Sequence, residues 1–103
     1  MSAYVANEEE LLKSMNSLIK AVYSGDHKKF QELILKKKVD LSATDRFYKR
    51  TVLHWAAMQQ SPGFLEGLIK YGVTPEDLLR KDADERIPLS IVRDPVFLFL
   101  HIS

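Results

Sequence analysis

The feature of this sequence that most limits its fold is a pattern of apolar and small residues that occurs twice, 35 positions apart. The matched pairs are Leu18 and Leu53, Ala21 and Ala56, Phe30 and Leu65, Leu33 and Leu68, and Ile34 and Ile69. A third copy begins at Asp82, where Pro88-Leu89 matches Val52-Leu53 at an offset of 36. Such a period indicates a chain built from repeated units that bury their apolar faces against one another.

Helix signals divide each unit into short helices. In the first unit Asn7 is expected to cap a helix over about residues 7–24, and Asp26 a second one that ends in the lysines at 36–38. In the second unit we expect helices over about 52–60, from Pro62 to Gly72, and for a turn or two after Thr74-Pro75. Residues 94–102 suggest a last helix that starts at Asp94-Pro95.

The stretch TVLHWAA, residues 51–57, resembles the T-P-L-H-x-A signature of the ankyrin-repeat family and differs from it only by Val52 in place of proline. The third unit resembles the family's D-x-x-G-x-T-P-L start, with Glu85 for glycine, Ile87 for threonine and Ser90 for histidine. The resemblance implies an all-α fold, a short stack of about 2.5–3 helix-turn-helix repeats with an N-terminal capping helix. It implies one domain over 1–103, with repeat 1 at about 15–45, repeat 2 at about 46–81 and a divergent or truncated repeat 3 at about 82–103.

The signature residues are interpreted as structural. Ala56 and Ala57 allow paired helices to approach closely, and Leu53 and Trp55 supply large apolar area for burial. In the family, Thr and His at these places link neighbouring turns by hydrogen bonds, so the resemblance implies that role for Thr51 and His54. A catalytic role for His54 needs a nucleophile or an acid partner, and the motif supplies neither.

For function, the resemblance implies a non-enzymatic protein–protein interaction module, an adaptor or scaffold that binds through its loops and concave face. By position, this marks the following partner-binding candidates: Arg46, Phe47, Tyr48, Lys49, Arg50, Met58, Gln59 and Tyr23. Ala83, Asp84 and Arg86 fall in the next loop. Tyr and Arg are enriched at binding hot spots, although Phe47 can instead fold back onto its own loop.

The last residues suggest an alternative, homodimerisation. The apolar run includes Val96, Phe97, Phe99 and Leu100, and one side of a single helix cannot bury all of its side chains. An end of this kind either belongs to a longer array or docks on a second copy, a partner or its own stack.

A third, less favoured reading is nucleic-acid binding. Residues 20–55 hold nine cations against four anions, and most of the cations lie in the segment 28–50. Phe47 and Tyr48 could act there as stacking platforms. The simpler reading is a solvated helix face.

Several classes of function find no support in the sequence. The chain has no cysteine, and His27 and His101 lack spaced ligand companions, so neither a metal site nor a cofactor is expected. The acidic residues 8–10 and Glu76-Asp77 stand at helix starts, where they suit the helix dipole. No stretch approaches 18 apolar residues, and no signal peptide is recognisable, so we expect a cytoplasmic or nuclear protein that does not enter a membrane.

Overall fold

A computed structural model describes residues 8–59 and 62–91 of the chain. These residues form only helices, with no strand among them, so the predicted all-α class is confirmed for this part. The helices are α1 (Glu8–Lys13), α2 (Ser17–Ser24), α3 (His27–Leu35), α4 (Val52–Met58), α5 (Gly63–Gly72), α6 (Pro75–Leu78) and α7 (Pro88–Ile91). The expected helix after Asp94 and the candidate self-association residues Val96, Phe97, Phe99 and Leu100 lie outside the described residues.

Side-chain caps set the starts of four helices. Asn16 accepts a hydrogen bond from the backbone N–H of Ile19 at 2.8 Å, and Asp26 accepts one from Lys29 at 3.0 Å. Thr51 and Thr74 each form a capping box with the third residue of their helix. These caps satisfy backbone donors that have no partner inside the helix, which is why the boundaries follow local sequence.

The N-terminal region differs from the prediction. One helix was expected over 7–24, but α1 ends at Lys13 and α2 begins at Ser17. The hydroxyl of Ser14 donates to the carbonyl of Leu11 at 2.7 Å, and Asn16 takes extended backbone angles as the cap of α2. Serine and asparagine side chains offer the backbone alternatives to helical hydrogen bonds, and here two of them divide an otherwise continuous apolar pattern.

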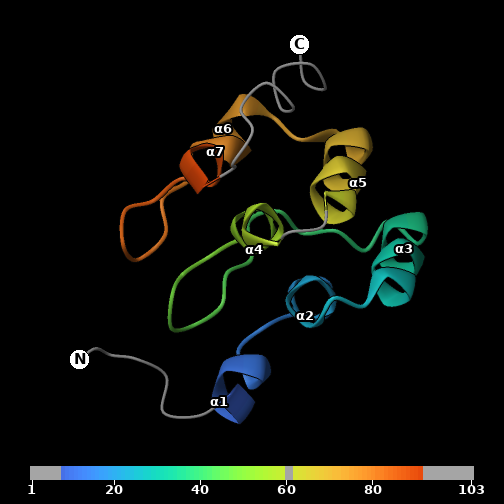
Figure 1. Cartoon of the computed structure of the whole chain (residues 1–103), viewed down its shortest axis with the longest axis horizontal. Helices are drawn as coiled ribbons and strands as arrows, with labels where there is room; N and C mark the ends of the chain where they lie inside the picture. Colours follow the sequence, from blue (N-terminus) through green and yellow to red (C-terminus); the bar gives the residue numbers. More distant parts are fainter. Residues whose placement is uncertain (1–7, 60–61, 92–103) are drawn as a thin grey trace.

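The helices form two layers. Helices α2, α4 and α7 pack side by side in one layer, and α3 packs against α5 in the other. The loop before α4 and the loop before α7 project to the same side of the molecule, away from α3 and α5 (Figure 1). Helix α1 lies at the α2 end of the stack, where the Tyr23 hydroxyl donates to Glu8 at 2.8 Å. This arrangement places the two loops next to each other.

The core lies between the layers. Ile19, Leu53 and Leu68 have no measurable exposure, and Phe64 is 1% exposed. Phe30 of α3 packs edge-on to Phe64 with ring centroids 5.0 Å apart. No helix in the described part of the chain is long and apolar enough to cross a membrane.

Candidate functional site

The first loop, residues 45–50, is closed by the buried carboxylate of Asp45. This carboxylate accepts hydrogen bonds from the backbone N–H groups of Phe47 at 3.0 Å, Tyr48 at 2.6 Å and Arg50 at 2.9 Å. It also accepts one from the indole N–H of Trp55 at 3.3 Å. Four donors satisfy a carboxylate that is fully out of solvent, so the loop is fixed in one shape on the start of α4.

The second loop, residues 82–86, uses Asp82 in the same way. Its carboxylate accepts from the backbone N–H groups of Asp84 at 2.9 Å and Arg86 at 2.8 Å. Burial by itself favours the neutral acid. The hydrogen bonds from Arg86, from the Arg50 guanidinium and from Asp84 outweigh it and hold the pKa of Asp82 below its ordinary value. The second loop is therefore a shorter copy of the first.

Arg50 joins the two loops. Its Nε donates to Asp82 at 3.3 Å, and its guanidinium carbon lies 4.5 Å from the ring centre of Tyr48 and 5.0 Å from that of Trp55. The side chain is only 10% exposed. The sequence placed Arg50 among the partner-binding candidates. Its position instead gives it an intramolecular role, because its Nε donates to Asp82 and its flat face lies against two rings of the same chain.

His54 forms a second link between the loops. Its Nδ1 accepts from the backbone N–H of Thr51 at 3.1 Å, so the proton sits on Nε2, which lies 2.8 Å from the carbonyl oxygen of Arg86. The bonds between Thr51 and His54 therefore stay within the start of α4, and the bond from His54 to Arg86 reaches the second loop. Burial and the nearby Arg50 cation lower the pKa of His54, against the raising influence of the Arg86 carbonyl and Asp82. His54 is a neutral structural residue at neutral pH.

Trp55 brings together two tyrosines that the sequence analysis had singled out separately. Tyr23 of α2 packs edge-on to Trp55, with ring centroids 5.3 Å apart. Tyr48 of the first loop also packs edge-on to Trp55, with ring centroids 5.9 Å apart. Both tyrosines are half-buried, and the Tyr23 hydroxyl is bonded to Glu8, which raises the pKa of Tyr23. The result is a row of three aromatic rings that runs from α2 to the first loop.

Exposed side chains lie on the first loop and on α4, the two segments that carry Tyr48 and Trp55 of this row. Arg46 and Lys49 are exposed on the first loop, Phe47 is half-buried against the core, and Met58 at the end of α4 is 43% exposed. We call the following set the candidate face: Tyr23, Arg46, Phe47, Tyr48, Lys49 and Met58. Gln59 is not included because its amide donates to the carbonyl of Val22 at 2.9 Å, an internal contact between α4 and α2.

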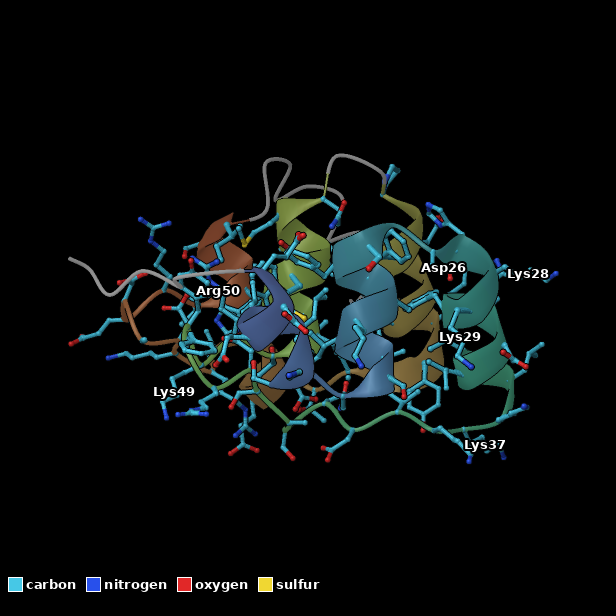
Figure 2. The ribbon with its side chains drawn as sticks, turned by 90° about the horizontal axis from the view of Figure 1, so that it is seen from below. Asp26, Lys28, Lys29, Lys37, Lys49 and Arg50 are labelled. Carbon is cyan, nitrogen blue, oxygen red and sulfur yellow. The ribbon has the colours of Figure 1, made fainter. Side chains whose placement is uncertain are left out.

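The cations of the segment 28–50 do not form one patch. Figure 2 shows Lys28 and Lys29 on α3 at one end of the molecule and Lys49 and Arg50 at the opposite end. On α3, Glu32 forms ion pairs with Lys29 at 3.4 Å and Lys36 at 3.2 Å, and both lysines lower its pKa. Folding therefore divides the basic segment that suggested nucleic-acid binding.

No cluster of three or more His, Asp or Glu side chains suited to a metal ion occurs within residues 8–59 and 62–91. His27, considered in the sequence as a ligand and set aside, stacks on Phe64 with ring centroids 4.1 Å apart.

No family model matches the chain, and neither a curated protein nor a solved structure matches it.

Proposed function

We propose that this chain is a short ankyrin-repeat stack and that it works as a non-enzymatic module that binds another protein. The fold part of the proposal is supported by the two layers of helices and by the loops that lie on one side. It is also supported by the hydrogen bond from His54 to the carbonyl of Arg86, which joins the second unit to the third. A stack of this kind presents the loops and the exposed side of the first helices as a binding surface.

The observation that carries the binding function is the fixed shape of the candidate face. The Asp45 carboxylate accepts hydrogen bonds from three backbone N–H groups of the first loop and from the indole of Trp55 in α4. Arg50 lies against the rings of Tyr48 and Trp55. A surface that is already ordered loses little conformational entropy on binding. Tyrosine, arginine and methionine are also enriched at protein interfaces. An ordered loop tip that carries such residues is suited to contact a partner.

Charge reversal on exposed residues tests this proposal. A partner captured by crosslinking would be purified and its Kd measured against the intact chain. Arg46→Glu and Met58→Glu should each weaken binding at least about tenfold, as expected when a hot spot is lost. Leu35→Glu is the matched control, since Leu35 is 81% exposed on α3, in the other layer. If the control weakens binding as much as the two variants do, or the two variants have no effect, the candidate face is not the binding surface.

Homodimerisation through Val96, Phe97, Phe99 and Leu100 remains a prediction from the sequence. The solution mass over a wide range of concentration tests it: a dimer at low micromolar concentration supports it, and a monomer throughout contradicts it. The structure gives nucleic-acid binding less support than the sequence did, because the cations lie at opposite ends of the molecule (Figure 2).

A further inference from the structure

A hollow of about 400 Å³ lies between the last turn of α1 and the first loop. Its lining residues are Glu10, Lys13, Ser14, Thr44, Asp45, Arg46 and Lys49. Three of these are cations, and they come from two segments that only the fold brings together. The hollow borders the candidate face, because Arg46 and Lys49 belong to both.

The three cations of this hollow differ in their ion pairs. Elsewhere in the molecule Arg50 is paired with Asp82, and Lys29 and Lys36 share Glu32. Among the described residues no carboxylate is in ion-pair contact with Arg46 or Lys49, and Arg46 lies over the ring of Phe47. Lys13 makes a long contact of 3.9 Å with Glu9, with both side chains largely exposed, so its charge is mostly screened by water instead.

The two carboxylates of the lining differ in accessibility. Asp45 is fully buried and its oxygens accept four N–H groups, so it does not present an anion to the hollow. Glu10 is exposed, and its charge opposes that of the three cations. The hydroxyl of Ser14 already donates to Leu11, which leaves the exposed Thr44 hydroxyl as the neutral donor.

From this arrangement we infer that the hollow binds a phosphate monoester carried by a side chain of the protein partner. A phosphate group has a charge near −2 and three acceptor oxygens, so three separate cations and a hydroxyl suit it. A carboxylate is satisfied by one arginine fork and does not need the remaining cations. The inference rests on the proposed function, since the partner supplies the phosphate.

Titration of the intact chain with small anions tests the hollow without any partner. Inorganic phosphate and O-phosphoserine are added at low salt while the backbone amide resonances are followed by NMR. We expect saturable shifts at Lys13, Arg46 and Lys49 with a Kd on the order of 1 mM, and at least about tenfold weaker binding of acetate. Equal binding of acetate, or the absence of saturable shifts, overturns the inference. The inference is also overturned if inorganic phosphate binds but phosphoserine binds no better than acetate does.

The Lys49→Gly variant tests the effect of removing one cation without changing the stability of the fold. Lys49 has a left-handed φ of 57°, which glycine adopts without strain, so this variant loses the cation without a loss of stability. We expect roughly tenfold weaker binding of phosphate. Glu85→Gly is the matched control, because Glu85 has the corresponding φ of 62° in the second loop and lies outside the hollow. The affinity of the Glu85→Gly variant for phosphate should stay within about twofold of that of the unchanged protein. Equal effects of the two variants overturn the inference.

Two further variants test the charge of the site. Glu10→Gln should strengthen phosphate binding, because it removes the opposing anion. Lys28→Gln, on α3 at the other end of the molecule, should leave the Kd unchanged (Figure 2). A loss of affinity in Lys28→Gln equal to that in Lys49→Gly would mean attraction by overall charge and would overturn the site. A partner that binds only in unphosphorylated form would also remove the phosphate inference, but would leave the protein-binding function standing.

Discussion

The Nε of Arg50 lies 3.3 Å from a carboxylate oxygen of Asp82, although 32 residues separate them in the sequence. Next to this contact the backbone N–H of Ala83 donates to the carbonyl of Tyr48 at 2.8 Å. Together with His54 and Arg86, these bonds tie the second loop to the first. The unit that contains α7 is therefore held both by the first loop and by α4, which packs against α7.

The ion pair gives the first prediction. Arg50→Met should lower the free energy of unfolding by about 3 kcal/mol, because it leaves the Asp82 carboxylate buried without its cation. Unfolding in urea measures the change. Lys81→Met is the control, since the pair of Lys81 with Glu85 is long, at 3.9 Å, and exposed, and its loss should change stability by less than about 0.5 kcal/mol. In the Asp82→Ala background, the Arg50→Met change should cost much less. An equal cost there would show that the pair is not coupled.

His54 gives a prediction for pH. The folded state lowers the pKa of His54 below its ordinary value of 6.5, so below pH 6.5 the unfolded chain binds a proton that the folded chain does not. The free energy of unfolding should therefore fall as the pH drops below 6.5, with a slope of at most about 1.4 kcal/mol per pH unit from this one group. Urea unfolding between about pH 5 and 8 measures it. A His54→Gln variant should lack this part of the slope, and an identical slope in both proteins would contradict the prediction.

Gly67 lies against an aromatic ring. A Cβ atom at this position would come 2.8 Å from Cε2 of Phe30, which is itself buried and packed on Phe64. Alanine gains about 1 kcal/mol of helix propensity over glycine, but overpacking costs about 1–3 kcal/mol, so Gly67→Ala should lower stability. Thermal unfolding measures the sign. In a Phe30→Leu background the ring is absent and the same change should raise stability, so a loss of equal size there would rule out the contact as its cause.

The end of α3 offers a stabilising change. Lys37 has a left-handed φ of 58°, and its N–H and that of Lys38 donate back to Ile34 and Leu33, a Schellman arrangement that normally ends in glycine. Lys37→Gly should raise the free energy of unfolding by about 0.5–1 kcal/mol. Lys38→Gly is the matched control, because it makes the same chemical change where φ is not left-handed, and it should be neutral or destabilising. If both variants behave alike in urea unfolding, the backbone argument fails.

Local sequence correctly predicted the features that depend on neighbouring residues. The caps at Asp26 and Thr74 mark helix starts, because each satisfies a donor only three residues ahead. The Thr51 and His54 bonds followed from the resemblance to a known signature. The break between α1 and α2 is equally local, because Ser14 and Asn16 mark it, although the apolar spacing continues across it.

The sequence by itself therefore determined the helical class, the starts of α3, α4 and α6, and much of the core. Only the tertiary structure decided which of the polar loop residues are buried and which are exposed. Arg46, Lys49 and Arg50 are all cations of the first loop. Arg50 is buried against Asp82, while Arg46 and Lys49 are exposed. The physical reason is that a charge can leave water only where an opposite charge and suitable hydrogen-bond partners converge on it. In this protein those groups come from a loop 32 residues away, which no local pattern specifies.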